Sequence, residues 1–211
     1  MRRGVHKCVK HLTGIVLCLL VSLCCNIAVY ACSFQSGIMT AIDYNCHVLT
    51  GGVTGRYFYK DSSTSIYNTI IGAAVSSWNT KSSDCSFTLT SNSGQAAIRY
   101  TTGTVSNPNS AGQTAHYYSS GSSCTPTNAN WGYAIITLST TEMSALTFSH
   151  KQGTCAHEFG HAIGLNHILT VAFTYEPTWI MTPYKNANGT VLRTATTPHT
   201  LEANIIDNHL Y

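Results

Sequence analysis

The chain has 211 residues, enough for one domain and a short processed segment, and only 9% of them are charged, against about 25% in an average soluble protein. Its formal net charge of +3 comes from the N-terminal end, because residues 32–211 contain seven basic and eight acidic side chains, a net charge of −1. That balance gives no indication of nucleic-acid binding, which depends on an excess of basic side chains.

Residues 1–31 have the layout of a secretory signal peptide. Four basic residues are followed by an apolar run, residues 12–31, which ends on small side chains at Val29 and Ala31. We therefore expect cleavage after Ala31 and a secreted domain of residues 32–211. Two alternatives stay open: the run is long enough to span a bilayer as an uncleaved anchor, and Cys32 stands where a lipid anchor is attached in bacterial lipoproteins.

Five of the nine cysteines lie beyond residue 31. Export permits disulfides, and an odd number leaves at least one thiol outside any pairing within the chain. The pairing cannot be read from spacing. The simplest interpretation is two bridges and one spare thiol among Cys32, Cys46, Cys85, Cys124 and Cys155.

The remaining chain, taken in order, predicts a single α+β domain. Residues 56–60, RYFYK, combine aromatic and basic side chains and predict a strand. Residues 65–79 predict an amphipathic helix packed on a sheet, in which Gly72 allows a strand to come close. Further strands are expected at residues 85–92, 96–102, 114–120 and 131–139. The apolar stripe of the helix consists of Ile66, Tyr67, Ile70, Ile71, Ala74, Val75 and Trp78.

A second helix is expected from about His150 to Ile163. Ser149 and Gln152 have the spacing of a capping box. Gly164 is suited to the left-handed conformation that ends helices. The chain then turns toward His167.

The stretch from residue 155 to 167, CAHEFGHAIGLNH, predicts a catalytic zinc site. His157 and His161 lie one turn apart on one helix face, and the turn at Gly164 returns His167 to the same ion. Zinc accepts three such nitrogens, keeps a fourth position for water and lowers that water's pKa to about 7. Glu158 is then expected to take the proton of the zinc-bound water and pass it to the leaving amine.

The pattern H-E-x-x-H-x-x-G-x-x-H resembles the metzincin clan of zinc endopeptidases. Met181, fourteen residues after His167, resembles the methionine of the metzincin Met-turn. Pro183 and Tyr184 look most like the matrixin branch, in which this segment lines the pocket for the substrate residue after the cut. The resemblance implies a minimal, bacterial-type catalytic domain: a twisted mixed β-sheet with two long helices, a Met-turn and a C-terminal helix at residues 200–211.

The resemblance also implies a protein or peptide substrate that pairs with an edge strand, for which residues 114–120 are the candidate. The clustered Asp and His that hold further ions in animal matrixins are missing, so calcium is not expected. We expect a monomer with no nucleic-acid or membrane partner after signal cleavage. His116, His150, His199 and His209 are interpreted as surface or hydrogen-bonded residues, and Tyr184 is left out of the catalytic set.

The leading hypothesis is therefore a secreted zinc-dependent endopeptidase that hydrolyses peptide bonds through a zinc-bound water activated by Glu158. One alternative is a catalytically inactive secreted or membrane-tethered binding protein that retains the zinc-peptidase fold. Another is a different class of zinc peptidase, with Glu176 instead of His167 as third ligand.

Overall fold

The computed structural model describes residues 39–40, 47–170, 177–184 and 192–211, all of which belong to the unit Phe34–Tyr211. The expected signal peptide and its cleavage site lie outside the described residues, and so do Cys32, Cys46 and Glu176. In the described part of the chain, every helix is too short or too polar to cross a membrane.

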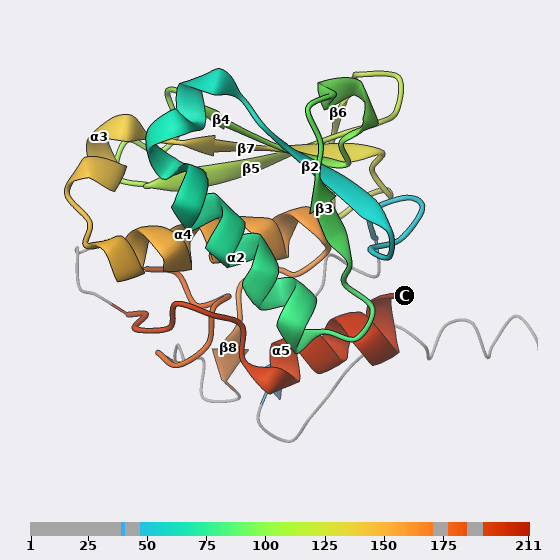
Figure 1. Ribbon diagram of the computed structural model, residues 1–211. Helices are drawn as coiled ribbons and strands as arrows, with labels where there is room; N and C mark the ends of the chain where they lie inside the picture. Colours follow the sequence, from blue (N-terminus) through green and yellow to red (C-terminus); the bar gives the residue numbers. More distant parts are fainter. Residues whose placement is uncertain (1–38, 41–46, 171–176, 185–191) are drawn as a thin grey trace, which may run out of the picture. The chain divides into compact units, whose positions relative to one another are not determined.

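The domain is built on a mixed sheet of six strands in the order β3-β2-β4-β7-β5-β6 (Figure 1). Neighbours from β3 to β7 run parallel, β5 is antiparallel to β7, and β6 is antiparallel to β5. A separate antiparallel pair joins β1, Met39–Thr40, to β8, Leu169–Thr170. The strands of the large sheet are β2 Arg56–Lys60, β3 Phe87–Leu89, β4 Ile98–Thr102, β5 Gly112–Tyr117, β6 Ser123–Cys124 and β7 Tyr133–Leu138.

Two long helices, α2 and α4, cross each other on one face of this sheet (Figure 1). The pattern of burial along β7 explains why helices cover this sheet. Alternate side chains, those of Ala134, Ile136 and Leu138, are fully buried, and the side chains between them are only partly buried. The helical segments are η1 Ser62–Tyr67, α2 Asn68–Lys81, η2 Ser93–Gln95, α3 Thr140–Ser144, α4 Phe148–Ala162, α5 Thr200–Ile205 and the π-helical η3 Ile206–Leu210.

The first predicted helix is right in place but wrong in two details. Residues 62–67 form a separate 3₁₀ helix, whose start is capped by the Asp61 carboxylate accepting the N–H of Ser63. Ile66 is consequently turned outward and 74% exposed, although the six other residues of the predicted stripe are buried. Gly72 does not bring a strand close, because a Cβ added there would meet nothing within 4 Å.

The second predicted helix starts earlier than its capping box suggested. α4 begins at Phe148, and the cap is the hydroxyl of Thr147, which accepts the N–H of His150, so Ser149 is not the cap. Its end agrees with the prediction, since Gly164 has φ of 115°. This backbone conformation favours glycine and turns Leu165 into the core, where it is fully buried.

Buried side chains from the rest of the domain fix the position of α4. Three aromatic side chains each donate a hydrogen bond to a backbone carbonyl of this helix and have their rings in the core. Hydrogen bonding and apolar burial therefore both hold the helix against α2 and the sheet. The three bonds join Trp78 to Ala156 at 2.8 Å, Tyr100 to Cys155 at 3.0 Å and Trp131 to Ala162 at 3.0 Å.

The expectation of two disulfides is wrong. Cys85, Cys124 and Cys155 are free and buried, so three of the five cysteines beyond residue 31 take part in no bridge. Cys155 lies inside α4 and is completely inaccessible, which makes it a packing residue.

Gly160 should tolerate no side chain, because α4 packs closely at this point. A Cβ on Gly160 would overlap the Met181 sulfur and lie 3.1 Å from Cζ2 of Trp78. We expect Gly160→Ala to reduce the free energy of unfolding by about 1–3 kcal/mol, as overpacked cores do, measured by urea denaturation. Gly72→Ala is the matched control: with open space around it, the alanine should be neutral or stabilising, since alanine favours the helix by about 1 kcal/mol.

Candidate metal centre

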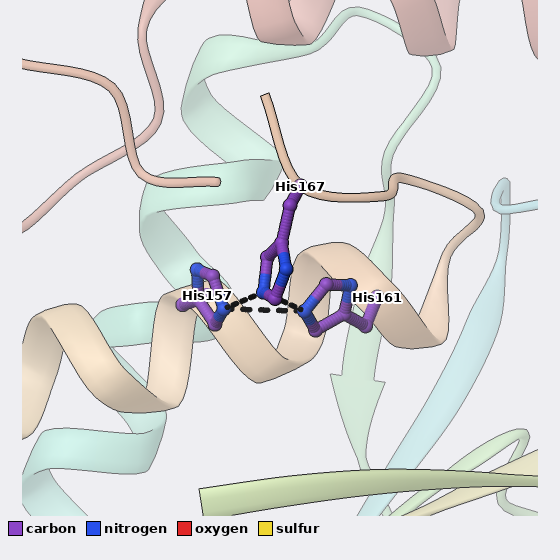
Figure 2. A group of neighbouring side chains, drawn as sticks. All are labelled: His157, His161 and His167. Carbon is purple, nitrogen blue, oxygen red and sulfur yellow. Dashed lines mark hydrogen bonds between the residues drawn. The ribbon is translucent and has the colours of Figure 1, made fainter. Parts of the chain in front are cut away.

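Three imidazole rings converge at one point beside the sheet (Figure 2). His157 and His161 come from successive turns of α4, and His167 comes from the loop that follows Gly164. Their Nε2 atoms form a nearly equilateral triangle: 3.1 Å between His157 and His161, and 3.2 Å from each of these to His167. The structure thus brings together the three residues that the sequence predicted as ligands.

Backbone carbonyls orient two of these rings. Nδ1 of His157 donates a hydrogen bond to the carbonyl of Ile180 at 2.7 Å, and Nδ1 of His161 donates to the carbonyl of Leu165 at 2.8 Å. Since a carbonyl only accepts, the ring proton is on Nδ1 in both cases. The Nε2 atom of each of these two rings therefore carries a lone pair, and the two lone pairs point toward each other.

The donor set fits a metal ion. Two imidazole lone pairs 3.1 Å apart repel one another unless a cation lies between them. Nitrogens bound at about 2.0–2.1 Å on the corners of a tetrahedron are about 3.3–3.4 Å apart, close to the spacing found here. His157, His161 and His167 could accordingly hold one ion.

The surroundings keep the three imidazoles neutral, which is the form that binds metals. Burial is the main cause for each, and it holds the pKa of His157 and of His161 well below the usual value. His167 is more exposed as a residue, but the loss of water around its ring, helped by the positive charge of Arg193, lowers its pKa to about 4.

Glu158 lies beside the histidines in the same buried region. Its Oε2 accepts a hydrogen bond of 2.7 Å from the hydroxyl of Thr114 on β5. Burial raises the pKa of Glu158 to about 7, against the opposing effects of the Thr114 hydrogen bond and the Arg193 charge. Gly112 leaves room for this carboxylate, because a Cβ on Gly112 would lie 2.8 Å from Cγ of Glu158.

The Met-turn passes directly behind His157. Met181 is fully buried in it, and the turn closes through the N–H of Thr182, which donates to the carbonyl of Trp179 at 3.3 Å. The Ile180 carbonyl that orients His157 belongs to the same segment. The methionine therefore lies in the turn that supports the metal centre.

Two buried charged side chains that the sequence analysis missed hold this turn from both sides. Glu202 of α5 accepts the N–H groups of Ile180, at 3.0 Å, and of Met181, at 2.7 Å. Arg193 donates to the carbonyls of Ile180, at 2.8 Å, and of Thr182, at 3.3 Å. A capping pattern, with Glu202 three residues after His199, was the available signal for Glu202. Arg193 has no such local signal.

The histidines and Glu158 line a cavity of about 550 Å³. Pro183 and Tyr184, the predicted pocket wall, line it too. The hydroxyl of Tyr184 is hydrogen-bonded to His150, with 3.2 Å between Oη and Nδ1, and the two rings pack together.

The strand predicted at residues 114–120 as the substrate edge is β5, Gly112–Tyr117, so it begins and ends earlier than predicted. Of the predicted range only Thr114 lines this cavity, together with Gly112 and Gln113. Among the described residues, β6 pairs only with His116 and Tyr117, so the outer edge of residues 112–115 has no strand partner there. His116 is buried and donates to the carbonyl of His161 at 3.0 Å, which agrees with its interpretation as a hydrogen-bonded residue.

No family model matches the sequence, and no curated protein matches it either. Solved structures do resemble the fold. One crystal structure of myroilysin has a TM-score of 0.50 at 12% identity, over 75% of this chain and 84% of that one. Another structure of myroilysin has a TM-score of 0.45 at 12% identity, over 84% and 95%.

The comparison and the topology together define the class of fold. The chain forms an α+β, metzincin-like domain with a mixed six-stranded sheet, two long helices, a Met-turn and a C-terminal helix. At 12% identity the likeness concerns the fold alone. What the domain does depends on the chemistry of its own site.

Proposed function

We propose that the protein is a secreted zinc-dependent endopeptidase, in which His157, His161 and His167 hold one zinc ion and Glu158 is the general base. One observation carries this proposal: three Nε2 atoms 3.1–3.2 Å apart share a cavity with a buried carboxylate. Three histidine ligands beside a carboxylate are typical of a hydrolytic zinc site and not of a structural one, since structural zinc sites are usually closed by four protein ligands, often thiolates.

Zinc, when bound, supplies Lewis acidity toward the carbonyl oxygen of the substrate and makes water more acidic. Glu158 moves the protons: one of its carboxylate oxygens takes a proton from the attacking water and later delivers it to the amine that leaves. A pKa near 7, to which burial brings Glu158, suits both steps at neutral pH. The hydroxyl of Thr114 holds the Glu158 carboxylate in its orientation by donating a hydrogen bond to Oε2.

The substrate is proposed to be an extended peptide. The unpaired outer edge of residues 112–115 can hydrogen-bond to a peptide backbone, which gives affinity with little dependence on sequence. Pro183 and Tyr184 then form a wall for the side chain after the cut. We further propose that residues 1–31 direct export and that the domain acts as a monomer.

The test is digestion of a peptide library derived from a whole proteome, with the exported protein, with and without a chelator. We expect internal cleavage that stops when metal is removed and returns when zinc is restored, together with about one zinc per chain. Zinc-loaded, folded protein that cleaves nothing would instead support the inactive binding protein. Cleavage that survives complete metal removal would contradict the metal centre.

Thr114→Val should weaken catalysis without loss of metal. A hydrogen bond to a charged group contributes about 1.5–3 kcal/mol, so kcat/KM should fall about tenfold or more. Because the Thr114 hydrogen bond lowers the pKa of Glu158, removing it should also move the acidic limb of the kcat/KM profile to higher pH. Thr88→Val, on the exposed part of β3, is the control. An unshifted limb would show that Thr114 does not act on Glu158.

A further inference from the structure

Arg193 is a buried cation without a matching anion. Its side chain is 2% exposed, yet it lines the cavity. One nitrogen, Nη1, donates to the carbonyls of Ile180 and Thr182. Among the described residues, no carboxylate oxygen lies within 4.0 Å of the guanidinium, although Glu158 and Glu202 act on it from further away.

This arrangement is unusual, because a buried charge normally has an ion-pair partner. Arg193 stays charged: burial lowers its pKa only to about 10. Its guanidinium has five N–H donors, and the two carbonyls occupy only Nη1. The unused donors suit a planar carboxylate, to which arginine binds through two parallel hydrogen bonds.

Thr154 provides a second, independent observation on the same cavity. It lies on α4, one turn before His157, is 4% exposed and lines the cavity. Its hydroxyl is buried and has no hydrogen-bond partner among the described residues. Leaving a buried hydroxyl unpaired costs about 1–3 kcal/mol, a cost that a ligand with a polar group would remove.

We propose that Arg193 and Thr154 form a subsite that selects substrates with an acidic side chain, Asp or Glu, immediately after the cleaved bond. This inference rests on the proposed function, in which Pro183 and Tyr184 border the side chain at that position. The substrate carboxylate pairs with Arg193 and accepts a hydrogen bond from Thr154. Arg193 is thereby a specificity residue as well as a support of the Met-turn.

The other acidic groups of the cavity do not cancel this preference. Besides Glu158, only Glu142 among the described lining residues carries a carboxylate, and Glu142 is partly exposed. Water and salt weaken its field, whereas the Arg193 charge acts in a region from which water is largely excluded. A metal ion on the three histidines would add positive charge in the same cavity.

The first test is binding, so that it does not depend on catalysis. Glu158→Gln protein is titrated with short peptides that begin with Glu, Gln or Leu, as a product does after cleavage, and end in an amide. We expect the Glu peptide to bind at least about tenfold more tightly than the Gln and Leu peptides. Equal affinities, or tightest binding of the Leu peptide, would overturn the proposal even if the protein proves to be a peptidase.

A chain-terminal carboxylate offers the same chemistry as an acidic side chain. Peptides that end one residue after the cleaved bond, made with a free carboxylate or an amide, separate the two sources. We expect amidation to leave the preference for Glu intact. If only peptides with a free terminal carboxylate bind well, Arg193 recognises chain ends and the proposal in this form is wrong.

Variants assign the preference to the two residues. Thr154→Val keeps the side-chain shape and should reduce the Glu-to-Gln ratio of affinities and of kcat/KM about threefold to tenfold. Arg193→Gln should abolish it, and Arg193→Lys should restore part of it. If Arg193→Gln fails to fold, Thr154→Val and Arg193→Lys decide: ratios equal to wild type in both would contradict the subsite. If no peptide is cleaved but the Glu peptide is still preferred, the proposed function fails, and Arg193 and Thr154 remain a binding site for an acidic side chain.

Discussion

Glu158→Gln is expected to lower kcat/KM for peptide cleavage by about 10³-fold, within the range that general acid–base groups contribute. The amide has nearly the same shape but cannot accept the proton of water. The Thr114 hydroxyl can still donate to the remaining oxygen, so the fold and the three histidines should be undisturbed. Steady-state kinetics on one library-derived peptide gives the rate, and metal analysis gives the zinc content.

The comparison with Glu142→Gln makes this result specific. Glu142→Gln removes a carboxylate that lines the same cavity but belongs to α3 and is partly exposed, and it should change kcat/KM by less than about threefold. Glu158→Gln protein that keeps its zinc and cleaves at the wild-type rate would remove Glu158 from the mechanism. Loss of zinc together with activity would instead make Glu158 a support of the metal centre.

Glu202→Ala is expected to have the largest effect on stability. Two buried backbone N–H groups, those of Ile180 and Met181, and the partly buried N–H of His199 lose their acceptor. Each unpaired buried donor costs about 1–3 kcal/mol, so the free energy of unfolding should fall by about 3–5 kcal/mol. That is a large share of the total of about 5–15 kcal/mol for such domains.

Urea denaturation measures this decrease in the free energy of unfolding, and Glu202→Gln serves as an intermediate variant. Glutamine keeps one acceptor oxygen but turns an NH₂ group toward backbone donors, so its stability should lie between alanine and wild type. Zinc affinity should fall in both variants, because Glu202 holds the segment whose Ile180 carbonyl orients His157. A decrease in unfolding free energy below about 1 kcal/mol for Glu202→Ala would show that water replaces the carboxylate.

The features that the sequence predicted well are set by local physics. The strand at residues 56–60 has the predicted bounds, because its enrichment in aromatic residues, which favours a strand, is visible in the chain. The spacing of His157 and His161 fixes their common helix face, and Gly164 ends the helix as left-handed glycines do. In this sense the convergence of the histidines followed from thirteen consecutive residues.

The features that were missed depend on contacts between distant segments. Thr114 reaches Glu158 from 44 residues away, and Glu202 reaches Met181 from 21 residues away. Neither pairing has a periodic signal in the sequence. Ile66 was misplaced for a related reason: hydrophobic spacing did not reveal that Asp61 starts a separate 3₁₀ helix, which rotates Ile66 out of the predicted stripe.

Cys155 gives the domain a built-in reporter of motion. Burial raises the pKa of its thiol far above the usual value, and the residue is wholly enclosed between the helix that carries the histidines and its neighbours. Alkylating reagents can reach it only when that helix moves away from the sheet. The labelling rate of Cys155 thus measures how often α4 opens away from the sheet, and a metal ion bound to the three histidines should slow it.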